Sequence, residues 1–127
     1  MKFFLLPLAY AVLVGPAAAA PDARFLASLD RLDPDTRLEQ ICDLEAMRKM
    51  GQGGIRIDRA KSNVLIPPQH LGHTLVAKGG AFRSNGKWYQ MSFSCKATPD
   101  HKAVLDFSYK TGPAIPPAKW QSYGLWK

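Results

Sequence analysis

The sequence predicts an α+β fold: two N-terminal helices packed on a single antiparallel sheet of hairpin-meander type, with one helix-to-strand disulfide. Three observations support this prediction. Apolar residues recur at helical spacing before residue 50, strand alternation with a hairpin signal follows residue 80, and each of these halves holds one of the two cysteines. We assign residues 1–20 to a cleaved signal peptide and 21–127 to a single α+β domain.

The N-terminal residues have the layout of a secretory signal peptide. Lys2 precedes an apolar run over residues 3–14, and small residues follow at 17–20. The apolar run is too short to span a membrane. We therefore expect an exported protein, periplasmic or secreted, that does not span the membrane after cleavage.

Two helices are expected next. Apolar residues at helical spacing predict the first helix over Asp22–Leu32. Asp33 has the character of an N-cap and Pro34 suits the first helical position, so a second helix is predicted from Pro34 to about Met50. The apolar face of this helix comprises Leu38, Ile41, Cys42 and Met50, with Met47 at its margin.

The stretch from Gly54 to Gly80 carries weaker signals. Ile55 and Ile57 alternate with charged residues and indicate a short strand, and residues 64–66 indicate another. Residues 71–78 are consistent with a strand or a turn, and we expect the glycine pair at 79–80 to break it.

Asn85-Gly86 is a strong hairpin signal. A two-residue loop here pairs Ser84 with Lys87, Arg83 with Trp88 and Phe82 with Tyr89. In the second strand of the hairpin, alternate residues face the core: Tyr89, Met91, Phe93, Cys95 and Ala97.

A third strand is predicted over residues 103–110. Its inward residues are expected to be Ala103, Leu105, Phe107 and Tyr109. A one-residue slip would mix the two faces, so the connection needs an odd residue count or a bulge, and Phe93 then faces Leu105 or Phe107.

Cys42 and Cys95 are expected to form a buried disulfide. Cys42 lies on the apolar face of its helix, and Cys95 lies on the core face of its strand. Behind an export signal, a cysteine pair meets an oxidising compartment. The pair is therefore interpreted as a structural bond between helix and sheet.

Charge is unevenly distributed along the chain. Residues 22–45 hold seven acids and three bases, whereas residues 46–127 hold three acids and thirteen bases. A basic face attracts anions, and outside the cytoplasm these are lipopolysaccharide, phospholipid head groups and acidic glycans. The leader argues against a nucleic-acid partner. The alternative is that scattered lysines only maintain solubility.

The face opposite Cys95 is the predicted binding surface. Trp88 and Arg83 project from it, where they would form a cation–π pair. The full predicted set is Arg83, Lys87, Trp88, Gln90 and Lys96. The alternative is that a second layer formed by residues 65–77 covers Trp88.

Aromatic residues also recur near the C-terminus, at Trp120, Tyr123 and Trp126. On a helical turn they would form one stripe. Such a stripe either closes the core or, if exposed, stacks on sugar rings or docks a partner.

Catalytic and metal-binding signals are weak. His70 and His73, with His101 farther along, are the candidate metal ligands, but no carboxylate or thiol accompanies them in the sequence. No serine lies in a nucleophile-elbow motif. We expect no cofactor and no enzymatic activity.

Several segments resemble the DUF930 proteins, a bacterial family of unknown function. They are residues 32–44, the Ala81–Tyr89 hairpin, Phe93-Ser94-Cys95, Phe107-Ser108-Tyr109-Lys110 and the closing Ile115-Pro116, Trp120 and Tyr123-Gly124-Leu125. The resemblance implies an exported protein, mainly of alphaproteobacterial type. It implies no activity, substrate or catalytic residue.

The functional hypothesis is a non-catalytic envelope protein that binds an anionic glycan or lipid, or a protein partner, through a basic, aromatic surface. An alternative is a periplasmic inhibitor or adaptor of another protein. A small hydrolase or metal carrier is a third alternative, which the sequence favours least because no catalytic constellation is present.

Overall fold

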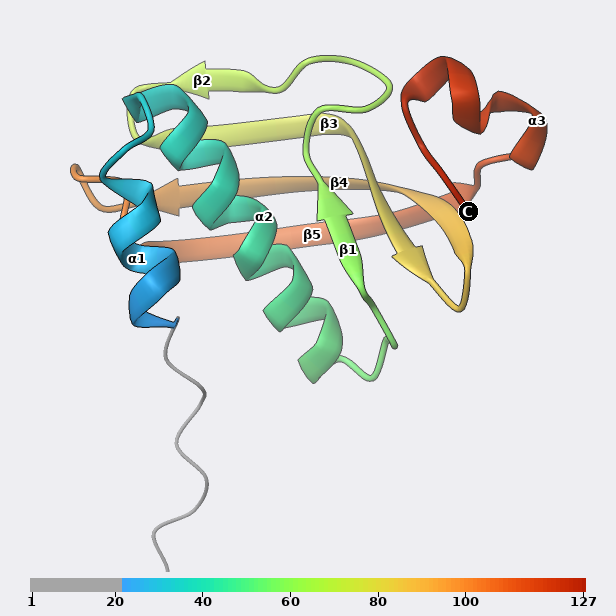
Figure 1. The fold of residues 1–127 in the computed structure, drawn as a ribbon, viewed down its shortest axis with the longest axis horizontal. Coiled ribbons are helices and arrows are strands. Elements are labelled where there is room, and N and C mark those ends of the chain that lie inside the picture. The colour runs from blue at the N-terminus through green and yellow to red at the C-terminus, as the bar shows by residue number, and fades with distance from the viewer. Residues whose placement is uncertain (1–21) are drawn as a thin grey trace, which may run out of the picture.

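The computed structural model describes residues 22–127 and has two helices on one face of a five-stranded antiparallel sheet (Figure 1). The predicted α+β fold is therefore confirmed. The helices α1 and α2 precede the strands, and two short helices, α3 and η1, follow them. Their bounds are α1 (Ala23–Leu29), α2 (Pro34–Gln52), β1 (Arg59–Lys61), β2 (Gln69–Leu71), β3 (Thr74–Ser84), β4 (Lys87–Ala97), β5 (Val104–Ala114), α3 (Pro117–Trp120) and η1 (Gln121–Tyr123).

The sheet has the strand order β1-β3-β4-β5, and β2 pairs with β3 as well. The predicted signal peptide, residues 1–20, lies outside the described residues. Within residues 22–127, no helix combines the length and apolar character that crossing a membrane requires.

Helix α2 begins where its capping residues predict. The Asp33 side chain accepts hydrogen bonds from the backbone N–H of Thr36 at 3.1 Å and from its hydroxyl at 2.7 Å. The hydroxyl contact is the main cause that lowers the pKa of Asp33. Pro34 occupies the first turn, where its missing N–H costs nothing. Local chemistry therefore sets the start of this helix.

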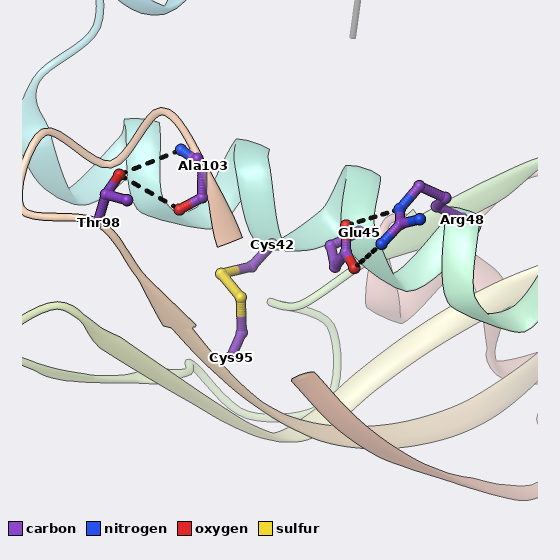
Figure 2. The surroundings of a disulfide bond; sticks show 6 residues. All are labelled: Cys42, Glu45, Arg48, Cys95, Thr98 and Ala103. Carbon is purple, nitrogen blue, oxygen red and sulfur yellow. Dashed lines mark hydrogen bonds and ion pairs between the residues drawn. A yellow bond between two sulfur atoms is a disulfide. The ribbon is translucent and has the colours of Figure 1, made fainter. Parts of the chain in front are cut away.

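The apolar face of α2 covers the sheet and is joined to it covalently. Leu38, Cys42 and Met50 are fully buried against residues of β3 and β4. The predicted disulfide between Cys42 and Cys95 is present, with the two Cα atoms 6.0 Å apart, and it links α2 to β4 (Figure 2). The bond lies within the main hydrophobic cluster.

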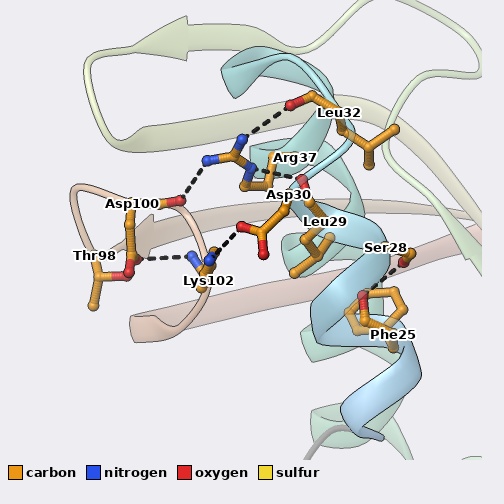
Figure 3. Close-up of polar contacts among 9 residues, drawn as sticks. All are labelled: Phe25, Ser28, Leu29, Asp30, Leu32, Arg37, Thr98, Asp100 and Lys102. Atoms are coloured by element: carbon orange, nitrogen blue, oxygen red, sulfur yellow. Dashed lines mark hydrogen bonds and ion pairs between the residues drawn. The ribbon is translucent and has the colours of Figure 1, made fainter.

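Arg37 connects α1 and α2 to the loop between β4 and β5 (Figure 3). Its guanidinium donates to the carbonyl oxygens of Leu29 and Leu32, each at 2.9 Å, and to that of Asp100 at 3.1 Å. Asp30 also forms an ion pair with Lys102 of the same loop, and this contact lowers the pKa of Asp30. The Arg37 side chain therefore supplies hydrogen-bond donors to carbonyl oxygens at the end of α1 and just after it, where intrahelical donors run out.

The β3–β4 hairpin has the predicted register. Ser84 pairs with Lys87, and the two pairs before it also match the prediction. Asn85 and Gly86 both have positive φ, 51° and 73°, as a type I′ turn requires.

Strand β3 differs from the sequence prediction. It runs through the glycine pair that was expected to break it, because a bulge between Ala77 and Gly80 absorbs one extra residue. Before the bulge, odd-numbered residues such as Leu75 and Ala77 face the helices. After it, the even-numbered Phe82 faces them instead. The strict alternation by which a strand is recognised is therefore lost here.

The two short strands expected before β3 are absent. Residues 55–57 and 64–66 form no strand, and β1 starts at Arg59 instead. The N–H groups of Val64 and Leu65 nevertheless donate to the carbonyl oxygen of Gly79, at 3.2 and 2.7 Å. This loop therefore satisfies backbone groups of β3 without forming a ladder.

Replacing Gly79 with alanine should destabilise the protein by about 1–3 kcal/mol, because the new methyl group would overpack this contact. A Cβ at this position would lie 2.5 Å from the backbone nitrogen of Ile66. Gly51→Ala is the matched control: it lies in α2 with nothing within 4 Å of the added Cβ, and should stabilise the protein by up to about 1 kcal/mol. Urea unfolding measures both, and equal stability of Gly79→Ala and wild type would contradict the contact.

The register of β5 was predicted correctly only in part. The expected bulge is present, because Lys96 pairs with Asp106 while Ala97 pairs with Val104. Leu105 is the extra residue and is 62% exposed, so its predicted inward position is wrong. Phe93 pairs with Tyr109 rather than with Leu105 or Phe107, although the rings of Phe93 and Phe107 are 5.1 Å apart between centroids.

Candidate functional site

Trp88, the centre of the predicted binding surface, is fully buried, and its predicted exposure is wrong. It belongs to a second hydrophobic cluster, on the sheet face away from the helices, with Ile115, Trp120 and Leu125. Its indole N–H donates to the carbonyl oxygen of Trp126 at 2.7 Å. The C-terminal segment thus folds back over the sheet, which burial of these apolar residues favours. The alternative prediction, that residues 65–77 form a layer over Trp88, is correct in part, because Leu65 also packs against this cluster.

The remaining predicted binding residues do not form one surface. Arg83 pairs with Asp58, with 3.2 Å between Nη1 and Oδ2, and Gln90 is half-buried. Lys87 and Lys96 are exposed but lie at opposite ends of β4. Nine residues of extended strand span about 30 Å, so the two lysines cannot contact one small ligand together.

The structure instead places a basic, aromatic surface at β1 and Trp126. Trp126 is 44% exposed, although Trp120, six residues earlier in the predicted stripe, is buried. The Arg59 Cζ atom lies 5.7 Å from the centroid of the Trp126 ring, and the Lys61 Nζ atom lies 5.4 Å from it. Both distances are within cation–π range. We call Arg59, Lys61 and Trp126 the basic aromatic site.

The basic aromatic site borders a hollow of about 430 Å³ between α2 and β1. Gln40 and Asp43 of α2 line its opposite wall. A volume in this range is typical of small-ligand sites, which combine apolar walls with a few polar groups. The hollow therefore offers two cations, an aromatic face, an amide and a carboxyl group.

Asp43 is the perturbed titratable group of this hollow. Burial raises its pKa to about 7, and the negative charge of Glu39 adds to the rise. Hydrogen bonds from the hydroxyl and backbone of Ser62 and the positive charge of Lys61 act in the opposite direction and lower the pKa. Its Oδ1 atom is buried and has no hydrogen-bond partner among residues 22–127. A carboxyl with this pKa is partly protonated near neutral pH, so it contributes less negative charge beside the cations than an ordinary aspartate.

The candidate metal ligands are not brought together. His70 Nε2 lies 3.7 Å from Glu39 Oε2, whereas His73 Nδ1 lies 3.0 Å from His101 Nε2. The other ring nitrogen of His101 is 2.7 Å from the carbonyl oxygen of Pro34. Since a carbonyl oxygen only accepts, the Nδ1–H of His101 donates to it, and the Nε2 atom of the same ring faces His73. Among residues 22–127, no three His, Cys, Asp or Glu side chains are grouped to hold a metal.

Sequence reasoning missed Arg59 and Lys61. Their alternation around the buried Ala60 was the available signal, because alternate residues of a strand share a face. The nearby alternation at Ile55 and Ile57 was interpreted as the strand instead. Trp126 was identified as part of an aromatic stripe, but its proximity to β1 depends on how the C-terminal segment folds back.

Comparison with known proteins gives one family. The family described as "Domain of Unknown Function (DUF930)" matches residues 29–125. That stretch contains α2, all five strands and both cysteines. Neither a curated protein nor a solved structure matches the chain.

Proposed function

The chain belongs to the DUF930 family, and we propose that this member is an exported, non-catalytic envelope protein of alphaproteobacterial type that binds an anionic envelope component. The binding surface is the basic aromatic site. The leader-like residues 1–20 and the disulfide between Cys42 and Cys95 support the location, since disulfides persist in oxidising compartments.

The observation that carries the proposal is an exposed Trp126 flanked by Arg59 and Lys61 at the mouth of a hollow. Cations placed over an indole attract phosphate or carboxylate, and the ring offers a flat apolar face for a sugar or a lipid glycerol. The excess of thirteen bases over three acids in residues 46–127 adds a long-range attraction for anions.

Binding to anionic vesicles tests the proposal. Arg59→Ala/Lys61→Ala should weaken binding to phosphatidylglycerol-containing vesicles by about 10- to 30-fold at low salt, because each cation near such a surface contributes about 1 kcal/mol. Sedimentation of protein with vesicles measures the change. Binding of the wild type should fall steeply at high salt and be absent on neutral phosphatidylcholine vesicles.

The matched control is Lys96→Ala/Lys110→Ala, which removes the same charge from exposed positions of β4 and β5 that do not line the hollow at Trp126. It should weaken binding about threefold at most, since screening limits the contribution of distant charges. Equal loss in the two double variants would show that net charge alone drives binding, and would refute the assignment to the basic aromatic site.

A further inference from the structure

We propose that the ligand is an anionic amphiphile, whose charged head group lies on the basic aromatic site and whose hydrocarbon chain lies in an apolar groove beside α2. This inference rests on the proposed function and specifies its ligand class. The supporting observation is a second, larger hollow with an apolar lining, which a purely polar anion bound at the basic aromatic site would not fill.

The apolar groove is a hollow of about 990 Å³ between α1, α2, the segment after α2 and the start of β5. Its apolar lining includes Leu26, Ile55, Ile57 and Val104, all partly buried against the main cluster. Partly buried apolar side chains that border an open hollow lose further contact with water when a hydrocarbon fills it. A hydrocarbon has no polar groups, so it needs no hydrogen-bond partner in such a lining.

The groove and the hollow at the basic aromatic site share one wall. Phe25, Leu44 and Met47 line both of them. Leu44 and Met47 are three residues apart in α2 and therefore lie on the same side of that helix. The two hollows are therefore neighbours. One molecule can place its polar end in the first hollow and its apolar end in the groove, with its middle lying across the side chains that both share.

The charges around the two hollows differ in a way that orients such a ligand. Among residues 22–127, three cations line the groove. Arg48 pairs with Glu45 at 2.6 Å, as part of Figure 2 shows, and Lys102 pairs with Asp30, so these two are neutralised by their partners. The third, Arg56, shares the lining with the carboxylate of Asp22. At the other hollow, Arg59 and Lys61 lie over the Trp126 ring. The head group is therefore expected at the basic aromatic site and the chain in the groove.

A series of monoalkyl phosphates with chains of 8, 10 and 12 carbons, kept below micelle-forming concentration, tests this directly by calorimetry. Each added pair of methylenes should tighten Kd about tenfold, because burying one methylene contributes about 0.8 kcal/mol. A neutral alkyl maltoside of the same chain length should bind at least tenfold more weakly. These measurements use the wild-type protein and do not depend on any variant folding.

Two variants separate the chain from the head group. Val104→Glu should abolish the dependence on chain length, because Val104 lines the groove and not the hollow at the basic aromatic site, and a carboxylate there opposes hydrocarbon burial. Leu105→Glu is its control, because it introduces the same charge at an apolar residue that is 62% exposed and does not line the groove. Arg59→Ala/Lys61→Ala should weaken all three phosphates by a similar factor and leave the dependence on chain length unchanged.

The possible failures are distinguishable. Vesicle binding that needs Arg59 and Lys61, without any dependence on chain length, would retain the proposed function and overturn the amphiphile. Dependence on chain length that persists in a folded Val104→Glu protein would overturn the groove as the chain site. Equal affinity for the maltoside would overturn the anionic head group, and absence of binding to both phosphates and anionic vesicles would overturn both proposals.

Discussion

Replacing Cys42 and Cys95 together with alanine should lower the free energy of unfolding by about 4 kcal/mol. The bond closes a sequence separation of 53 residues, which in the unfolded chain removes much of the freedom of the intervening segment. For a domain of this size such a loss lowers Tm by about 20 °C. Differential scanning calorimetry of the oxidised wild type and the double variant measures it.

Alanine is the appropriate replacement because both cysteines are fully buried, and a serine would leave a hydroxyl without a partner in the main cluster. Reducing agent provides the control: it should lower the Tm of the wild type and leave that of the double variant unchanged. If the wild type melts at the same temperature with and without reductant, the bond does not stabilise the fold.

Asp43→Asn should stabilise the protein by up to about 4 kcal/mol above pH 7 and have little effect below pH 4. In the folded protein burial raises the pKa of Asp43 from 3.8 to about 7. Between about pH 4 and pH 7, the carboxyl group is protonated in the folded state and ionised in the unfolded state. Raising the pH through this range therefore favours unfolding, and the wild type loses stability. Asparagine has no proton to lose and avoids the cost of a buried charge.

Urea unfolding of both proteins between pH 3 and pH 9 measures this difference, and other titrating groups cancel because the two chains share them. Asp106→Asn, at an exposed position of β5, is the matched control and should follow the wild-type curve. A constant difference between Asp43→Asn and wild type across the whole pH range would show that the carboxyl does not titrate in this window.

The parts of the fold that were predicted correctly depend on chemistry close in sequence. Asp33, Thr36 and Pro34 start α2 through contacts within one turn. Asn85 and Gly86 determine the hairpin because few residues tolerate two successive positive φ angles. The disulfide followed from these two elements, since each placed its cysteine on an apolar face.

The incorrect predictions concern contacts between distant segments. Trp88 occupies a position on the outer face of its strand that is usually solvated in a two-layer fold. The return of the C-terminal segment, together with residues 64–65, buries it. The bulge at Leu105 was anticipated as one option, but its position depends on the six residues that connect β4 to β5. The basic aromatic site likewise joins residues 59–61 to Trp126, a juxtaposition that no local pattern encodes.

Strand β3 contributes to both hydrophobic clusters, because its alternate residues face opposite sides of the sheet and the bulge sets which residues face which side. Leu75, Ala77 and Phe82 contribute to the cluster under the helices, while Ala81 contributes to the one under the C-terminal segment. Substitutions in one cluster can therefore accumulate over evolution with little effect on the other, because distant sites act nearly independently. Insertions and deletions are different: a single residue gained or lost near Gly79 would exchange the two faces of everything that follows in the strand. Within this family, selection should therefore hold the length of β3 more strictly than its composition.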